Sequence, residues 1–170
     1  MGLTQVVSLN VDTQKTSQSL LLAYTAQIYA SDTSLYLTQP YNWYSAQFRD
    51  TNWTYIHKFD ISDDVATYKG TGGIEGDILN QYAMDEYQGN LRVATTITRS
   101  AALQPADVNG AVSQIFNMSR TFSRVTVLGQ DDHGLKTLGM TGEIAKDERI
   151  FSARFIGDRG FVVTFRQTDP

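Results

Sequence analysis

The sequence predicts an all-β protein whose strands pair antiparallel and whose structural unit occurs at least twice. Short segments of alternating apolar and polar residues, each about 4 to 8 residues long, follow one another with no helical pattern of ordinary length between them. The 170 residues include nine tyrosines and only three prolines in a chain rich in threonine and valine, which favours strands over helices. A stretch near the C-terminus also matches an earlier one, and internal repeats indicate a modular architecture.

The repeat joins residues 147–170, DERIFSARFIGDRGFVVTFRQTDP, to residues 77–100, DILNQYAMDEYQGNLRVATTITRS, which lie seventy positions earlier without a gap. Further matches extend the repeat: Thr67, Thr71, Gly72, Ile74, Asp77 and Ala83 meet Thr137, Thr141, Gly142, Ile144, Asp147 and Ala153, and Leu91 and Val93 meet Phe161 and Val163. One repeat unit therefore spans about 53–100, and the next spans about 123–170.

The N-terminal part of the chain predicts two consecutive hairpins. Residues 5–12 alternate apolar and polar side chains, and a polar turn leads to a second strand around 20–24. Residues 26–38 repeat this pattern, with the turn-forming Ser-Asp-Thr-Ser at 31–34 between the strands. Residues 39–52 break the alternation with a proline and contain several aromatic residues, which predicts a connecting loop.

The middle of the chain gives the clearest single strand, at residues 53–62, where aromatic and apolar side chains alternate. A short partner strand is expected at 66–71 and should end at Gly72 and Gly73. These glycines can adopt backbone angles closed to other residues, so we expect a sharp turn into the next unit there.

The second half predicts three more pairs of strands. Strands at 80–86 and 91–98 form a hairpin, and 124–128 and 135–140 form the next pair, whose turn is Asp-Asp-His-Gly. The hairpin within 147–170 closes the chain. Between the first two pairs, residues 99–120 lack a clear period and predict a loop insertion with one marginal helical turn.

About twelve strands joined hairpin to hairpin favour blades of four antiparallel strands, which is the strand count of a β-propeller. A sandwich has similar strand spacing but does not readily explain a gapless repeat of seventy residues. We therefore predict one domain, residues 1–170, that is a partial β-propeller of about three blades. The expected core between the sheets comprises Ile28, Leu35, Leu37, Tyr55, Phe59, Leu91, Val93, Ile150, Phe155, Phe161 and Val163.

At these segments the chain resembles a known family, the secreted bacterial and archaeal proteins with a C-terminal β-propeller distantly related to WD-repeat propellers. The resemblance rests on IYASDTSLYLTQPYNWY (28–44), TYIHKFDIS (54–62), GDILNQYAMDEYQGNLRVATT (76–96) and ERIFSARFIGDRGFVVTFRQTDP (148–170). It implies a propeller fold and an extracellular, periplasmic or cell-surface location. It supplies no catalytic residues. The chain begins inside a blade and stops where the family pattern continues, so it looks like a fragment.

Composition restricts the partners of the protein. Fourteen basic residues against 18 acidic ones give a net charge of −4 and an acidic pI, so nucleic acid is not an expected partner. The absence of cysteine removes disulfides and thiolate chemistry. No stretch has the roughly 18 apolar residues of a membrane span, and no signal peptide stands at the start. We expect no cofactor.

Three groups of residues could carry chemistry, but each has a simpler structural explanation. Asp85 and Glu86 are adjacent, so on a strand they point to opposite faces and cannot serve one glycosidase pocket. Asp131-Asp132-His133 could bind a metal, yet its position between two strands indicates a turn. His57 is expected to pack among aromatic neighbours. We therefore predict no catalytic residue and no metal site.

The aromatic residues Tyr41, Trp43, Tyr44 and Trp53 are the best candidates for a ligand-binding site, because ring faces on a loop can stack on sugars or hold a peptide. The alternative is an apolar plug between blades. We predict a non-catalytic scaffold that binds a protein or glycan. The competing hypothesis is a glycoside or peptide hydrolase whose site is completed by absent blades. We also expect self-association through open blade edges.

Overall fold

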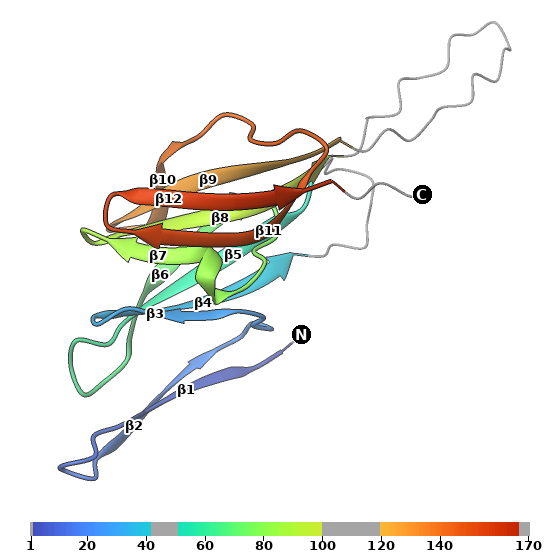
Figure 1. The fold of residues 1–170 in the computed structure, drawn as a ribbon. Helices are drawn as coiled ribbons and strands as arrows, with labels where there is room; N and C mark the ends of the chain where they lie inside the picture. Colours follow the sequence, from blue (N-terminus) through green and yellow to red (C-terminus); the bar gives the residue numbers. More distant parts are fainter. Residues whose placement is uncertain (1, 42–50, 100–119, 167–170) are drawn as a thin grey trace, which may run out of the picture.

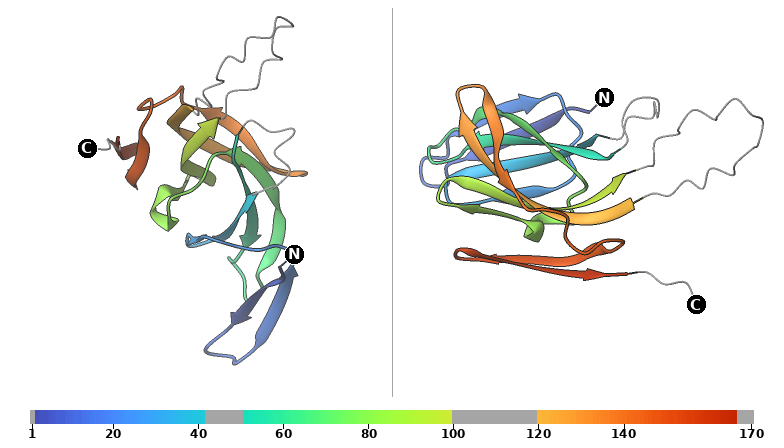
Figure 2. Two further views of the ribbon diagram at one scale, coloured as in Figure 1. Left: turned by 90° about the vertical axis from the view of Figure 1, so that its right-hand side faces the viewer. Right: turned by 90° about the horizontal axis from the view of Figure 1, so that it is seen from above.

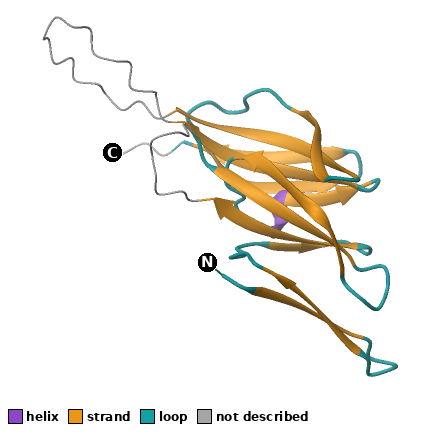
Figure 3. Ribbon diagram, turned by 180° about the vertical axis from the view of Figure 1, so that it is seen from behind, coloured by secondary structure: helices purple, strands orange, loops and turns teal. Residues whose placement is uncertain are grey.

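The computed structural model describes residues 2–41, 51–99 and 120–166, and within them the fold is all-β (Figure 1). One short 3-10 turn, η1 (Gln81–Ala83), lies among the strands and is the purple element in Figure 3. The strands in the described residues are β1 (Thr4–Leu9), β2 (Thr16–Leu21), β3 (Ile28–Ala30), β4 (Ser34–Tyr41), β5 (Trp53–Asp60), β6 (Thr67–Glu75), β7 (Met84–Tyr87), β8 (Asn90–Arg99), β9 (Arg120–Asp131), β10 (Gly134–Met140), β11 (Arg149–Ile156) and β12 (Arg159–Phe165).

The strands form two four-stranded antiparallel sheets between two hairpins. Sheet I has the order β3-β4-β5-β6 and sheet II has the order β7-β8-β9-β10, while β1-β2 form the N-terminal hairpin and β11-β12 the C-terminal hairpin. The four units follow one another in space in the order of the chain (Figure 2). The predicted all-β class and the four-stranded antiparallel blades are confirmed. In the part of the chain that is described, the strands amount to three blades in number but are distributed as two whole blades and two half-blades.

The seventy-residue repeat crosses the boundaries between these sheets. A shift of seventy positions places β5 and β6 on β9 and β10, which are the last two strands of sheets I and II. The same shift places β7 and β8 on β11 and β12. Each repeat copy therefore contains the outer half of one blade and the first half of the next.

The turn predicted at Gly72 and Gly73 is wrong. β6 continues through both glycines to Glu75, and the chain turns at Gly76, whose φ of +96° favours glycine. Gly72 instead allows a close approach to sheet II, because a Cβ there would lie 2.6 Å from the carbonyl oxygen of Leu135 on β10. A glycine in a strand can mark such a backbone approach rather than a turn.

The expected loop over residues 39–52 also begins later than predicted, because β4 extends through Tyr41. Pro40 is tolerated in this strand because β3 pairs with β4 only from Leu35 to Leu37, so no ladder bond from β3 requires an amide hydrogen at Pro40. The loop insertion expected at 99–120 lies almost wholly outside the described residues, and only its ends, Arg99 and Arg120, are placed in strands.

The apolar core lies between successive sheets. The largest cluster joins sheets I and II and contains Tyr36, Ile56, Ile74, Met84, Leu91, Val93, Leu128 and Leu135. A second cluster, around Ala94 and Ile150, joins sheet II to the C-terminal hairpin. A third, around Leu37 and Phe59, joins sheet I to the N-terminal hairpin. The core is thus a series of interfaces between blades.

Of the predicted core residues, Leu37, Phe59, Leu91, Val93 and Ile150 are buried, and Leu35, Tyr55 and Phe155 are partly buried. The prediction is wrong for three others, since Ile28, Phe161 and Val163 are 54%, 52% and 56% exposed. On β12 the alternate residue Val162 packs against sheet II. The opposite face of β12, which carries Phe161 and Val163, has no sheet packed on it within the described chain.

Candidate functional site

The aromatic end of sheet I, defined by Tyr41, Trp53 and Tyr55, contains two of the four predicted ligand-binding residues. Tyr41 and Trp53 are directly opposite each other in the β4-β5 register, and both are partly buried. The rings of Tyr41 and Tyr55 meet edge to face with centroids 5.5 Å apart. The structure therefore brings Tyr41 and Trp53 together, whereas the other two predicted residues, Trp43 and Tyr44, lie outside the described residues.

Glu75 connects the aromatic end to sheet II. It lies opposite Trp53 in the β5-β6 register. Its Oε1 accepts a hydrogen bond of 2.7 Å from a guanidinium nitrogen of Arg99, and its Oε2 accepts one of 2.7 Å from Arg124. Side chains that sequence reasoning did not select thus stand beside the predicted aromatic residues.

Thr51 and Asn52 also link the two sheets at this end. Thr51 forms an isolated antiparallel bridge with Arg99. The side-chain oxygen of Asn52 accepts a 3.0 Å hydrogen bond from the backbone N–H of Thr98, and its amide nitrogen donates to the backbone oxygen of Thr96 at 3.3 Å. These bonds hold the start of β5 against the end of β8, so the aromatic end and the end of sheet II form one local structure.

The arginine cluster, which we define as Arg99, Arg120 and Arg124, surrounds the buried ring of Phe122. The guanidinium carbons lie 5.2, 5.8 and 5.5 Å from the ring centroid, within the range of cation–π contacts. Arg120 also forms an ion pair with Glu143. One sequence signal marks the cluster: seventy positions before Arg124 the repeat has Thr54, so this cation departs from the repeat.

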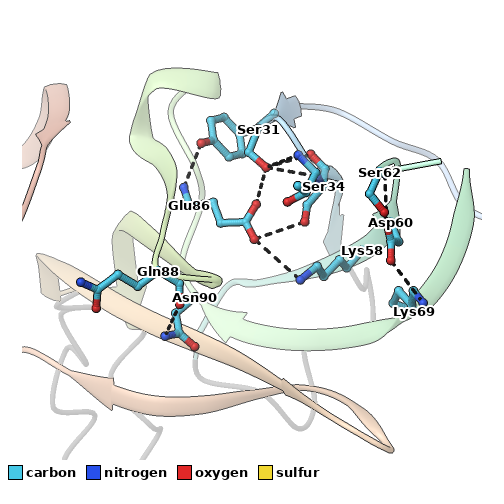
Figure 4. Close-up of polar contacts among 11 residues, drawn as sticks. Ser31, Ser34, Lys58, Asp60, Ser62, Lys69, Glu86, Gln88 and Asn90 are labelled. Carbon is cyan, nitrogen blue, oxygen red and sulfur yellow. Dashed lines mark hydrogen bonds and ion pairs between the residues drawn. The ribbon is translucent and has the colours of Figure 1, made fainter.

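A polar cluster connects sheets I and II in the region drawn in Figure 4. Glu86 on β7 accepts hydrogen bonds from the hydroxyls of Ser31 and Ser34, the second at 3.2 Å. Its Oε1 lies 3.8 Å from the Nζ of Lys58 on β5, and both side chains are about nine-tenths buried (10% and 8% exposed). The backbone N–H of Glu86 donates to the hydroxyl of Tyr29 at 2.8 Å. The cluster therefore acts as a latch between blades.

Tyr36 lies beside this latch, fully buried. Its ring is stacked with Tyr29, and the ammonium of Lys58 lies 5.6 Å from the ring centroid. Ser34 and Glu86 lie near the hydroxyl of Tyr36, but no hydrogen bond of normal geometry reaches it within the described residues. Burial, together with the negative charge of Glu86, raises the pKa of Tyr36 well above its usual value. Tyr36 therefore stays neutral.

A groove of about 380 Å³ lies along the first strands of three successive units. Its polar side chains include Gln81, Asp85 and Arg154, and the guanidinium of Arg154 lies 4.0 Å from the ring centroid of Tyr82. Sequence reasoning did not find this groove, because it depends on the contact of three strands that are far apart in the chain. Its remaining lining residues are Ile28, Tyr29, Ala30, Met84 and Phe155.

The residues considered for catalysis or metal binding have structural partners. Asp85 is paired with Arg92, whereas Glu86 belongs to the latch, so the two carboxylates serve different contacts. Asp131 accepts a 2.8 Å hydrogen bond from the backbone N–H of His133 and pairs with Lys136, as in a turn. No group of three or more His, Asp and Glu side chains in metal-binding proximity occurs among the described residues.

The arrangement of consecutive four-stranded antiparallel sheets packed face to face defines a β-propeller architecture. The family model described as a β-propeller domain matches residues 1–170. The chain belongs to this family and is a propeller scaffold. No helix in the described part of the chain is long and apolar enough to span a membrane.

Two curated relatives, both uncharacterized archaeal proteins, are similar to this chain. The protein of Archaeoglobus fulgidus is 36% identical over 122 residues, which are 72% of this chain and 15% of the relative. That of Methanocaldococcus jannaschii is 36% identical over 100 residues, which are 59% of this chain and 13% of the relative. The chain therefore spans less than a fifth of the length of these relatives. No solved structure matches significantly.

Proposed function

We propose that this propeller is a non-catalytic scaffold of an exported protein and that it binds a protein or glycan partner at the aromatic end of sheet I. The observation that carries the proposal is the placement of Tyr41, Trp53 and Tyr55 together at the end of β4 and β5, beside the arginine cluster of sheet II. Aromatic residues and arginine are enriched at the core of binding surfaces.

The glycine at position 73 supports this reading. A Cβ built on Gly73 would lie 3.5 Å from atoms of both Trp53 and Tyr55, so the two rings border a backbone that carries no side chain of its own. Because Gly73 has no side chain, none is interposed between these two rings at this position. Trp43 and Tyr44 complete the proposed site on sequence grounds.

A broad glycan and peptide array, followed by substitutions, tests the proposal. Trp53→Ala and Trp43→Ala should each weaken binding of whatever the array identifies by about tenfold or more, because buried aromatic anchors dominate binding energy. Tyr24→Ala is the matched control, since Tyr24 is an exposed aromatic (74%) outside the aromatic end. Binding that is unchanged in both tryptophan variants would remove the aromatic end from consideration.

The proposed export rests on the resemblance to secreted propeller proteins. It is tested by expressing the full-length natural protein in its host and treating intact cells with protease. An exported domain should be degraded, or found in the medium, while a cytoplasmic marker remains intact. Protection equal to that of the marker would contradict export.

We further propose that the 170-residue chain self-associates symmetrically through its half-blades. The hairpins at the two ends carry large exposed apolar side chains, among them Val7 and Leu20 (60% and 63%) and Phe151 and Ile156 (67% and 68%). Exposed apolar faces and unpaired strand edges favour association. Light scattering at micromolar concentration should give a dimer or larger species. A clean 19.0 kDa monomer with an intact β-sheet signal would refute the proposal.

A further inference from the structure

The arginine cluster violates a local rule of sheet stability. Arg99, the last residue of β8, and Arg120, the first of β9, are directly opposite each other in the antiparallel register. Like charges at directly opposite positions destabilise a strand pair. Arg124 adds a third guanidinium around the same buried ring of Phe122. Proteins break such local rules mainly at functional sites.

Within the described residues this cluster is neutralised only in part. Glu75 and Glu143 contact it, so three cations meet two anions among the described side chains, in a chain whose net charge is −4. The Nε of Arg124 is buried and has no hydrogen-bond partner in the described structure. The side chains of Arg99 and Arg120 are 41% and 45% exposed. Arg99 and Arg120 therefore present accessible guanidinium donors, and the described acidic side chains balance only two of the three charges of the cluster.

These donors suit a carboxylate. The planar guanidinium presents paired N–H groups that match the two oxygens of a carboxylate, and Arg99 already binds both oxygens of Glu75, at 2.7 and 2.9 Å. Trp53 lies opposite the same Glu75 in the β5-β6 register, so Glu75 connects the strand that carries the aromatic end to the arginine cluster. A ligand with both ring-shaped apolar faces and carboxylates would match the two features together.

We propose that the arginine cluster recognises the carboxylates of an acidic glycan, a chain of uronic acid units, whose sugar rings meet the aromatic end. This inference rests on the proposed function and specifies the ligand class of that same site. A uronic acid chain carries about one carboxylate per sugar ring, and the apolar faces of its rings match aromatic side chains. A more densely charged polyanion would be repelled by the negative charge of the rest of the molecule.

Calorimetric titration with hexagalacturonate, with its neutral methyl ester and with poly-L-glutamate tests the inference. The unesterified oligosaccharide should bind at least about tenfold more tightly than the other two probes. Arg120→Gln and Arg99→Gln should each weaken its binding about tenfold, because each removes a charge-assisted hydrogen bond. Arg120→Lys, which keeps the charge but loses the planar donor pair, should fall in between.

Arg159→Gln provides the matched control, because it removes the same charge from an exposed arginine (78%) at the start of β12. Its binding should equal that of the unmodified chain, and thermal melts of all variants check that they fold. Equal binding of the acid and the ester, equal effects at Arg120 and Arg159, or tighter binding of poly-L-glutamate would each overturn the inference.

If the acid and the ester bind equally and Trp53→Ala weakens both, the proposed function stands while this inference fails. If arginine-dependent binding is insensitive to Trp53→Ala, the arginine site stands and the aromatic site fails.

Discussion

The backbones of Gly70 on β6 and Gly134 at the start of β10 are in direct contact between sheets I and II. A Cβ built on Gly70 would lie 2.5 Å from the Cα of Gly134, and both residues have positive φ, +136° and +131°. Neither position can accept a side chain without moving one sheet away from the other. The spacing of the two blades at this edge is therefore set by paired glycines.

Gly72→Ala tests this spacing without changing a positive φ. The new methyl group would lie 2.6 Å from the backbone oxygen of Leu135, which cannot move aside as a flexible side chain could. We expect the free energy of unfolding to fall by about 1–3 kcal/mol, the usual cost of overpacking. Urea denaturation measures it. Gly139→Ala on β10, where a Cβ would meet open space, is the control and should change stability by less than about 0.5 kcal/mol.

We expect substitutions of Lys58 and Glu86, the ion pair of the latch, to have non-additive effects on the free energy of unfolding. Glu86→Gln or Lys58→Leu alone leaves its former partner buried without an opposite charge, and we expect each to cost about 1.5–3 kcal/mol. The double variant Lys58→Leu/Glu86→Ile introduces the apolar residues found seventy positions later, Leu128 and Ile156. It should cost clearly less than the sum of Lys58→Leu and Glu86→Ile, because no unpaired charge remains. Additive effects in a double-mutant cycle would show that the ion pair contributes nothing.

Removal of the hydroxyl group should affect the free energy of unfolding differently at Tyr36 and at Tyr29. Among the described residues no hydrogen bond of normal geometry reaches the buried hydroxyl of Tyr36, so Tyr36→Phe should leave stability unchanged or raise it by about 1 kcal/mol. The hydroxyl of Tyr29 accepts a hydrogen bond from the backbone of Glu86, so Tyr29→Phe should lower stability by about 1 kcal/mol. Thermal or urea unfolding of the two variants compares them directly. The opposite order would refute the description of the latch.

We expect the protein to become less stable in mild acid because of His57. Burial lowers the pKa of His57 below its usual 6.5, and the neutral ring contacts Thr71 and Gln39 at 2.7 and 3.2 Å. Below pH 6.5 the unfolded chain therefore binds a proton that the folded chain does not, so the free energy of unfolding decreases as pH falls, until the lowered folded-state pKa is reached. His57→Gln should flatten this part of the pH profile, whereas His133→Gln, at an exposed position, should leave it in place. Urea midpoints between pH 5 and 7.5 measure both.

Local patterns in the sequence identified the strands and some of their turns, although the turn predicted at Gly72 and Gly73 lies at Gly76. The alternation in residues 53–62 became β5, and the hairpin predicted from strands at 80–86 and 91–98 turns at Gln88 and Gly89, both at positive φ, between β7 and β8. In a strand with one buried face, apolar and polar side chains alternate, and this alternation is visible within a few residues. A short stretch of sequence is therefore sufficient to identify such a strand. The seventy-residue repeat likewise indicated a modular all-β fold, because similar units bury similar faces.

The tertiary structure alone decided which faces are covered and which charges meet. Ile28 and Val163 have the alternation of core residues, yet both are exposed. Ile28 lies on β3, the edge strand of sheet I, and Val163 lies on the face of β12 on which no sheet packs within the described chain. Glu75, Arg99 and Arg124 come together from three different strands of two sheets, and no local spacing encodes that contact. The physical reason is that packing between blades joins residues far apart in the chain, whereas strand periodicity depends only on near neighbours.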